Sequence, residues 1–351
     1  MNIVFISRQG NKPSIDFQIL IDRLKKENHN VFVSCKRVTK SPISLMKYFS
    51  TMLKQIKYIK KADVVILDSY CVPISMFKFK NKPKVIQIWH AVGLMKKTGY
   101  SILNAKEGGR STLLAKASHM HKGYDYIFAS SKACFPAIAE LFNYSEDKIV
   151  HQVLPRIDEL SDNKYINKTK EEIYEKYPQL KNGKKNILYA PTWRAHNEEF
   201  INEIMELEEI IDYDKYNLII KYHPISAQNQ AINEIVYTNA IVINEYNATE
   251  LAFVSDICVT DYSSVLYEFL LLGKPTYFYT FDIDDYDVNR GFYIDYIKEI
   301  PGGIRKTAKE LYKSIEKKDF DYKAGMTFAK KYVDIPKAGC LESIVEFIEK
   351  L

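Results

Sequence analysis

The chain has 351 residues and a net charge of +6 from 50 basic and 44 acidic side chains; 46% of its residues are hydrophobic and 27% are charged. At roughly 150 residues per domain this length suits two domains, and the near-average composition excludes wholesale disorder. The small positive excess does not suit a histone-like or arginine-rich nucleic-acid binder. It suits an anionic substrate or an anionic membrane surface.

The N-terminus and the cysteines exclude further classes. The chain begins MNIVFISR, without a basic region followed by a long apolar run, so we expect no signal peptide, and no stretch approaches the length of a membrane-spanning helix. The five cysteines are scattered, with no CxxC pair, and no histidine spacing is typical of a metal site. We therefore expect no disulfide framework, no metal site and a reducing cytoplasm.

Short apolar runs alternate with helical stretches in the first half of the chain. A helix is expected at 14–27. The expected strands are 2–6, 31–34, 64–67, 85–89 and 126–129. Strands that alternate with helices are typical of a parallel sheet covered by helices on both faces.

The pattern breaks near residues 158–185, where a polar segment and a charged helix at about 168–177 precede Pro178 and Asn182-Gly183. Strands are expected again at 186–190, 217–221, 240–243, 257–260 and 275–279. We therefore place a domain junction here. The expected organisation is an N-terminal α/β domain over 1–160 and a C-terminal one over 180–334, with a last helix of about 335–351 that is free to pack back on the first. Two doubly wound domains bind ligands in a cleft outside the carboxyl ends of their strands.

Polar residues follow four of the predicted strands directly. His90 follows 85–88, Arg194 follows 186–190, Lys221 and His223 close 217–221, and 261–264 follow 257–260. A phosphate-bearing substrate needs cationic or N–H donors for its phosphates and a base for the acceptor hydroxyl. This set of residues fits that chemistry.

Ser263 and Ser264 open a predicted helix, whose N-terminus carries partial positive charge and can hold a phosphate. Glu268, one turn further, can accept from ribose hydroxyls, and Asp261 precedes the serines. The plainer interpretation is that the serines cap the helix.

The other candidates also have structural alternatives. His90 suits a base because histidine titrates near neutral pH, or it is a core neighbour of Trp89. His223, preceded by Lys221, donates to a pyrophosphate or is a core residue before a proline turn. Arg194 binds phosphate with two nitrogens or pairs with a loop carboxylate.

Arg290 lies in the acidic segment 282–291, where we expect a loop and favour an ion pair within it. The acidic cluster lacks the glycine and terminal glutamate of an EF-hand, so that calcium motif is excluded.

Seven strings occur in one order: WHAVGLMKK, ASSKACFPAIAELF, LPRID, LYAPTWR, KYHP, VTDYSSVLYEFLLLGKP and YFYTFDIDDYDVNRGFY. Together they resemble the CDP-glycerol:poly(glycerophosphate) glycerophosphotransferase family, which builds teichoic acids and related polymers. The resemblance runs from about residue 84 to the end, whereas 1–83 share only the family's general α/β character.

The resemblance implies an α/β, GT-B-like fold with two Rossmann-like doubly wound domains facing a central cleft. It implies transfer of glycerol phosphate or ribitol phosphate from a CDP-polyol to a hydroxyl of a lipid-linked or polymer acceptor, with release of CMP. The CDP-polyol is a substrate, and no cofactor is expected. The implied location is peripheral, on the cytoplasmic face of the cell membrane.

Residue by residue, His90 matches the family's WHG histidine, expected to act as base, and His223 matches the HP histidine near the donor pyrophosphate. The matched donor-site positions are Arg194, Asp261, Ser263, Ser264, Glu268 and Arg290, to which we add Lys221. The chain departs from the family at Ala91 and Leu154, where glycine is common, and it has no long extra N-terminal region. These two differences weaken the assignment of the donor and the acceptor more than that of the reaction class.

Two basic segments are candidates for contact with an anionic membrane and the acceptor. In 45–61 an apolar face lies opposite a basic face formed by Lys47, Lys54, Lys57 and Lys61, as in helices that lie on bilayers. The alternative is a packed Rossmann helix with solvated lysines. The second segment follows His90 and includes Lys96, Lys97 and Arg110.

Two rival functions stay open at this point. One is a GT-B glycosyltransferase that uses a nucleotide sugar, and the other is an inactive membrane-associated binding protein. A nucleic-acid role is disfavoured because the lysines do not interleave with aromatic residues on a strand surface. The choice of glycerol or ribitol, the choice of priming or polymerising, and a homo-oligomeric state are left open.

Overall fold

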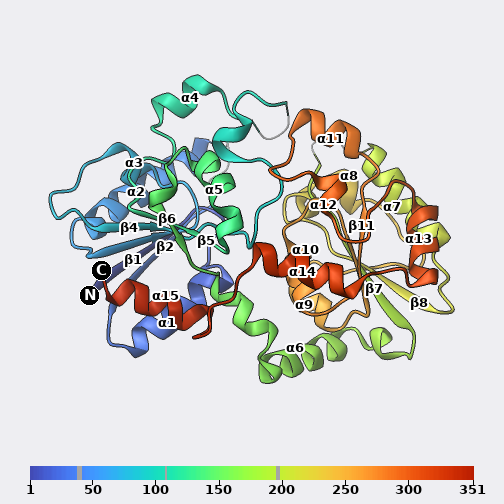
Figure 1. Cartoon of the computed structure of the whole chain (residues 1–351). Coiled ribbons are helices and arrows are strands. Elements are labelled where there is room, and N and C mark those ends of the chain that lie inside the picture. Colours follow the sequence, from blue (N-terminus) through green and yellow to red (C-terminus); the bar gives the residue numbers. More distant parts are fainter. Residues whose placement is uncertain (38–41, 107–108, 195–197) are drawn as a thin grey trace. The chain divides into compact units, whose positions relative to one another are not determined.

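The computed structural model describes residues 1–37, 42–106, 109–194 and 198–351. The chain divides into two compact units (Figure 1). The first comprises Met1–Asp158 and Tyr332–Leu351, and the second comprises Glu159–Lys331. Each unit contains one six-stranded parallel sheet. No helix within the described ranges is long and apolar enough to cross a membrane.

The sheet of the first unit has the strand order β2-β1-β3-β4-β5-β6. Its strands are β1 (Asn2–Ser7), β2 (Asn30–Cys35), β3 (Val64–Leu67), β4 (Lys84–Gln87), β5 (Tyr126–Ala129) and β6 (Ile149–His151). The direction of strand addition reverses between β1 and β3. Open α/β sheets bind ligands at the carboxyl ends of the strands that flank such a switch point.

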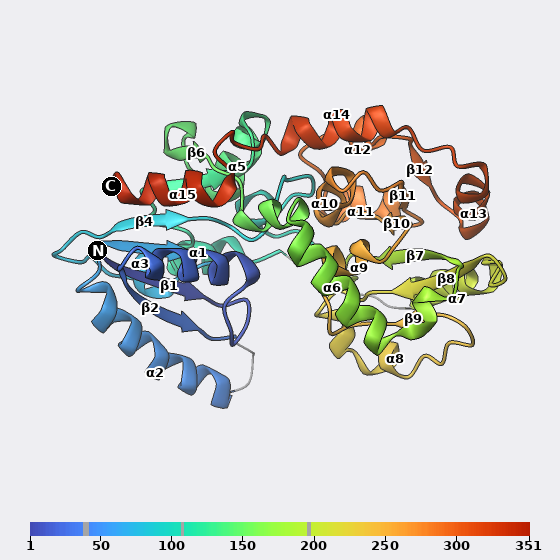
Figure 2. The same cartoon turned by 90° about the horizontal axis from the view of Figure 1, so that it is seen from below.

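Helices cover both faces of this sheet. They are α1 (Ile15–Lys26), α2 (Pro42–Ile59), α3 (Val72–Met76), α4 (Thr112–Ala117), α5 (Phe135–Phe142) and α15 (Cys340–Glu349). Figure 1 shows α1 and α15 on one face and α2 on the other, and Figure 2 views the sheet from the side of α1 and α15. Ser14 caps α1 by accepting from the Phe17 N–H, and the helix buries one apolar stripe that includes Phe17, Leu20 and Leu24. Nε and Nη2 of Arg23 each donate to the Glu342 carboxylate over 3.0 Å, which ties α1 to α15.

The sheet of the second unit has the strand order β12-β11-β10-β7-β8-β9. Its strands are β7 (Lys185–Ala190), β8 (Tyr216–Ile220), β9 (Ile241–Val242), β10 (Ile257–Thr260), β11 (Thr276–Tyr279) and β12 (Ile304–Arg305). Counted from β7, this is the dinucleotide-binding order 3-2-1-4-5-6. The switch point therefore lies between β7 and β10.

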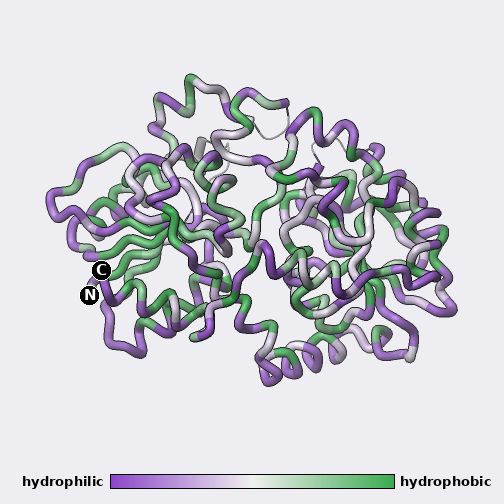
Figure 3. The backbone as a smooth tube through the Cα atoms, in the orientation of Figure 1, coloured by the Kyte–Doolittle hydropathy of each residue, from purple (hydrophilic) through white to green (hydrophobic). Residues whose placement is uncertain are grey.

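Alternate residues of β7 enter two different cores because successive strand side chains point to opposite faces. Ile187 and Tyr189 join one buried cluster, and Leu188 and Ala190 join the other. Figure 3 shows the strands of both sheets as mainly hydrophobic segments. Continuous apolar runs are typical of parallel strands that are covered on both faces.

The second unit also contains helices, several of which contribute residues to these two cores. They are α6 (Asn163–Lys176), α7 (Glu198–Ile210), α8 (Gln230–Asn233), α9 (Ala248–Phe253), α10 (Val265–Leu271), α11 (Ile283–Asn289), α12 (Tyr296–Glu299), α13 (Ala308–Lys317) and α14 (Tyr322–Tyr332). Short 3-10 turns are η1 (Gly99–Ile102), η2 (Lys132–Cys134), η3 (Glu146–Lys148), η4 (Pro155–Leu160), η5 (Pro178–Lys181) and η6 (Ser226–Gln228).

Three local predictions from the sequence differ from the structure. The acidic segment 282–291, expected as a loop, contains α11, which begins after Asp282. The charged helix expected at 168–177 begins earlier, at Asn163, because Asp162 accepts from the N–H groups of Lys164 and Tyr165. The edge strands β6 and β12 were not predicted, since three and two residues are too short to give a pattern.

Candidate active site

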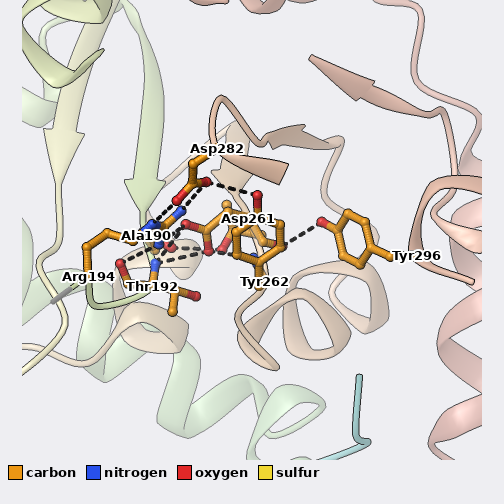
Figure 4. Close-up of polar contacts among 8 residues, drawn as sticks. Ala190, Thr192, Arg194, Asp261, Tyr262, Asp282 and Tyr296 are labelled. Carbon is orange, nitrogen blue, oxygen red and sulfur yellow. Dashed lines mark hydrogen bonds and ion pairs between the residues drawn. The ribbon is translucent and has the colours of Figure 1, made fainter. Parts of the chain in front are cut away.

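Arg194 ties together the ends of three strands in the second unit (Figure 4). It follows β7, whereas Asp261 follows β10 and Asp282 follows β11. Its Nη1 lies 2.9 Å from Oδ2 of Asp261 and 2.8 Å from the Thr192 carbonyl oxygen. Its Nε and Nη2 donate to the two Asp282 oxygens over 2.6 and 3.0 Å. Each of the three guanidinium nitrogens therefore contacts a protein oxygen.

These charges are deeply buried. Arg194 is 4% exposed and Asp261 is fully buried. Burial alone would lower the pKa of Arg194, but the carboxylates of Asp261 and Asp282 raise it well above its ordinary value. The rings of Tyr262 and Phe281 lie 5.1 and 5.3 Å from the guanidinium carbon and add cation–π attraction. The ionised cluster is thus stable in the protein interior.

This arrangement matches the structural alternative for Arg194, an ion pair with a carboxylate from the segment after β11. The cluster lies at the switch point between β7 and β10, where ligands bind in this class of sheet. Contacts of Arg194 and Asp261 with a donor phosphate stay a prediction, because their polar atoms are engaged with each other and with Asp282.

The turn after β10 is held from several sides. Asp261 accepts from the Thr192 and Tyr262 N–H groups, and its carbonyl accepts from the Tyr296 hydroxyl over 2.9 Å (Figure 4). The Tyr262 hydroxyl donates to Asp282 over 2.9 Å. The main chain directly before Ser263 and Ser264 is therefore held in place.

Ser263 and Ser264 are both partly exposed. Ser264 precedes α10 and makes no side-chain cap, and the Ser263 hydroxyl lies 3.4 Å from the Val265 nitrogen, which is a long contact. Helix capping is therefore a weak explanation for these serines. Glu268, expected to meet a ribose, is only 4% exposed.

His223 follows β8 and is exposed. Its Nδ1 accepts from the Ile225 N–H over 3.2 Å, so the neutral ring carries its proton on Nε2. His223 is not the core residue of the structural alternative. In this tautomer Nε2 is a donor, as contact with a phosphate oxygen requires.

Lys221 is 8% exposed, and its Nζ donates to the carbonyls of Tyr222 and Asn244, each over 3.2 Å. Burial lowers the pKa of Lys221. These bonds fix the segment before His223. Arg290 ends α11 and is partly exposed.

His90 follows β4 in the first unit and is partly exposed. The preceding Trp89 has φ of 61°, and its N–H donates to the Gln87 side-chain oxygen over 3.0 Å. This left-handed residue turns the chain sharply before His90. Positive φ is uncommon for a bulky residue and marks a strained position.

The ring of His90 is oriented by a main-chain carbonyl. Nδ1 lies 3.2 Å from the Asp68 carbonyl oxygen and 3.2 Å from the Gln9 side-chain nitrogen. A carbonyl can only accept, whereas a Gln amide can be turned, so we place the proton on Nδ1. The lone pair then lies on Nε2. Burial lowers the pKa of His90 to about 4, helped by the positive charges of Arg156 and Lys96, so the ring is neutral at pH 7.

The sequence analysis missed several polar residues around His90. Asp68 follows β3 and is 1% exposed, and among the described residues its two carboxylate oxygens have no hydrogen-bond partner of normal geometry. Burial raises the pKa of Asp68 to about 6. The position of Asp68 directly after a buried strand is the same signal that selected His90. Arg156 lies within the LPRID string but was given no role there, and Asp16 carried no signal of its own.

In the first basic segment, the buried and exposed residues do not follow the two faces expected from the sequence. Within α2, Ile59 is fully buried, whereas Phe49 and Leu53 are 60% and 55% exposed. Lys54, Lys57 and Lys61 are exposed, and the side chain of Lys47 lies outside the described residues. The helix therefore packs on the sheet along one edge and leaves an exposed apolar stripe formed by Met46, Phe49 and Leu53.

The second basic segment carries another exposed apolar site. Lys96 and Lys97 are partly exposed and Arg110 is exposed. The next helix, α4, exposes Leu113 and Leu114 by 81% and 67%. Within the described part of the chain, no group of three or more His, Cys, Asp or Glu side chains is placed to hold a metal ion.

Solved structures of similar fold define the class. The wall teichoic acid polymerase TagF superposes with a TM-score of 0.72 at 22% identity, over 99% of this chain and 88% of that chain. UDP-GlcNAc 2-epimerase from Neisseria meningitidis superposes with a TM-score of 0.67 at 17% identity, over 100% of both chains. The fold is therefore GT-B-like, as the sequence predicted.

The sequence comparisons define the family. The profile described as CDP-Glycerol:Poly(glycerophosphate) glycerophosphotransferase matches residues 1–350. The teichoic acid ribitol-phosphate primase of Bacillus spizizenii is 30% identical over 99% of this chain and 90% of its own length. The teichoic acid glycerol-phosphate primase of Bacillus subtilis is 28% identical over 89% of this chain and 78% of its own length. The chain belongs to the CDP-glycerol:poly(glycerophosphate) glycerophosphotransferase family. The family profile also covers residues 1–83, where the sequence analysis had found only the family's general α/β character.

Proposed function

We propose that this protein transfers glycerol phosphate or ribitol phosphate from a CDP-polyol to a hydroxyl of a lipid-linked or polymer acceptor, releasing CMP. Family membership across residues 1–350 supports this reaction class. The observation that carries it to chemistry is that the two histidines have opposite partners at Nδ1, a carbonyl oxygen for His90 and an N–H for His223. His90 presents a lone pair on Nε2, and His223 presents an N–H on Nε2.

The proposed reaction needs both tautomers, an unprotonated Nε2 on His90 and a protonated Nε2 on His223. The acceptor oxygen attacks the β-phosphorus of the CDP-polyol while Nε2 of His90 takes the hydroxyl proton. An oxygen–phosphorus bond forms, the bond from the β-phosphorus to the bridging oxygen breaks, and CMP leaves with that oxygen. Nε2–H of His223 donates to a pyrophosphate oxygen and stabilises the charge that grows on the leaving CMP.

The Ser263 and Ser264 hydroxyls are the next donors that we assign to the CDP-polyol, because they are partly exposed on a rigid turn. Arg194 and Asp261 hold that turn in place. Phosphate neutralisation is assigned to protein groups rather than to a metal or another cofactor. Loss of activity in EDTA that only a divalent ion restores would contradict this assignment.

We place the protein at the cytoplasmic face of the cell membrane as a peripheral protein. Two features of the first unit support this proposal. The exposed stripe of α2 is accompanied by Lys54 and Lys57, and the exposed leucines of α4 follow Arg110. Apolar residues beside basic ones suit the interface of an anionic bilayer, where a lipid-linked acceptor would be met.

The relatives do not decide between glycerol and ribitol. The ribitol-phosphate primase is 30% identical over 353 residues, and a Staphylococcus aureus glycerol-phosphate transferase is 32% identical over 254 residues. The chain spans 90% of the Bacillus spizizenii primase but 56% of the ribitol-phosphate polymerase of the same organism. The choice between glycerol and ribitol and the choice between priming and polymerising are therefore both left to be tested.

The test incubates the protein with CDP-glycerol or CDP-ribitol and a lipid-linked acceptor analogue, and measures CMP and product length. We expect acceptor-dependent CMP release with one donor. Release of a nucleoside diphosphate from a nucleotide sugar would support the glycosyltransferase alternative, which shares this fold. Binding of a CDP-polyol without turnover would support the inactive binding protein.

A further inference from the structure

Arg156, in the LPRID string, has no part in the mechanism above but forms an ion pair with the buried Asp16 beside His90. Arg156 lies in η4, and Asp16 lies in the first turn of α1. Nε of Arg156 is 3.1 and 2.9 Å from the two Asp16 oxygens, and Nη2 is 2.5 Å from Oδ2. The main-chain N–H of Arg156 also donates to Asp16 over 3.1 Å. Asp16 is 1% exposed, so these donors take the place of water around its carboxylate oxygens.

The same guanidinium reaches the backbone of His90. Nη2 of Arg156 donates to the His90 carbonyl oxygen over 2.9 Å. Asp16 and the His90 carbonyl thus share one nitrogen of a planar, rigid group. A second contact holds the ring, since Nδ1 meets the Asp68 carbonyl. His90 is therefore fixed both at its main chain and at its ring.

We propose that Arg156, fixed by Asp16, is a positioning residue for His90. This inference rests on the proposed function of His90 as the base. Arg156 acts through His90 and not through a contact with substrate. Its direct effect is to hold the His90 main chain so that Nε2 points toward the acceptor hydroxyl. A displacement of a catalytic group by about 1 Å is enough to cost on the order of 100-fold in rate.

Arg156 also adds to the electrostatic environment of His90. Its positive charge and that of Lys96 lower the pKa of His90, whereas Asp16 and the Asp68 carbonyl act in the opposite direction. Burial remains the largest cause of the low pKa. Removing the charge of Arg156 is therefore expected to raise the His90 pKa above about 4.

The alternative is that the ion pair only joins η4 to α1. Arg23 provides the matched control, because it joins α1 to α15 through two 3.0 Å hydrogen bonds to Glu342. The side chains of Arg23 and Arg156 are 26% and 23% exposed. Arg23→Gln therefore removes a similar tie from the same helix, and no contact of Arg23 with His90 is among those described.

The kinetic test compares Arg156→Gln, Arg156→Lys and Arg23→Gln in the full chain. We expect Arg156→Gln to lower kcat by about tenfold or more with little change in KM for the CDP-polyol, and Arg156→Lys to restore part of it. Arg23→Gln should leave kcat unchanged. In a His90→Asn background, Arg156→Gln should cause no further loss. Independent losses in that double variant, or equal losses in both Gln variants, would overturn the proposal.

Imidazole NMR tests the same idea without activity. In the wild type, His90 should show a protonated Nδ1, and in Arg156→Gln its pKa should rise and its ring signals should shift. Unchanged His90 signals in Arg156→Gln would reject the positioning role. Absence of CMP release by the wild type with every CDP-polyol would instead reject the proposed function, and the two failures are therefore distinguishable.

Discussion

Nη1 of Arg194 lies 2.9 Å from Oδ2 of Asp261, and this contact joins the ends of β7 and β10 on either side of the switch point of the second sheet. Asp282 completes the cluster from the end of β11. Two of the residues that the sequence assigned to the donor, Arg194 and Asp261, thus bind each other. What they present to a ligand is the turn that they hold, with Ser263 and Ser264 on it.

Arg194→Gln is expected to destabilise the second unit strongly. It would leave two carboxylates at the same site with no cation, and breaking such a buried pair costs about 3–5 kcal/mol. Thermal unfolding should therefore show a clear fall in Tm. Arg305→Gln is a milder control, because the Asp319 side chain that pairs with Arg305 is 41% exposed.

Binding of CDP-glycerol to folded Arg194→Gln separates the two roles of Arg194. We expect any weakening of binding to accompany the fall in Tm, because Arg194 holds the turn that carries Ser263 and Ser264. An unchanged Tm together with binding weakened tenfold or more would show that Arg194 contacts the donor and is not mainly structural.

His90→Ala is expected to lower turnover by about 100-fold or more while CDP-polyol binding changes little, because the base acts on the acceptor. Calorimetric titration and CMP release measure the two quantities. Turnover that survives the substitution would show that His90 is not the base.

His223→Ala, unlike His90→Ala, is expected to weaken CDP-polyol binding. Its Nε2–H is assigned to the donor, so the Kd for the CDP-polyol should rise, and His223→Gln should recover part of the loss because an amide N–H can replace the ring N–H. Equal Kd values for the Gln and Ala variants would argue against a hydrogen bond from residue 223. Comparison with His90→Ala under the same conditions is the control.

The strand pattern made most of the fold predictable. All ten strands expected from apolar runs occur at or within two residues of their expected positions, as with 64–67 and β3 or 257–260 and β10. The placement of His90 and His223 after strands followed from the same pattern. By contrast, the partners of Arg194 and Arg156 come from segments 88 and 140 residues away, and a single sequence carries no pairing signal over such distances. Asp68 was detectable by its position after β3, but its burial was not.

Glutamate substitutions in α2 test the membrane surface. Phe49→Glu and Leu53→Glu place a negative charge on the exposed stripe and should reduce recovery with anionic vesicles in flotation, because insertion and attraction to anionic lipid are both weakened. Lys181→Glu, on an exposed lysine of the second unit, is the charge control. Equal recovery of wild type with neutral and anionic vesicles would reject the electrostatic part of the proposal.

Asp68→Asn is expected to alter how stability depends on pH. Burial raises the pKa of Asp68 from 3.8 to about 6, so the folded protein binds its proton more tightly than the unfolded chain does. The stability that this proton provides is complete below about pH 4 and is lost as pH rises through about 6. The loss amounts to about 3 kcal/mol by pH 7. An Asn side chain remains neutral and avoids this loss. The free energy of unfolding of Asp68→Asn minus that of the wild type should therefore increase between pH 4 and 7 and then become constant. A flat difference over this range would show that the pKa of the buried Asp68 carboxyl is not raised.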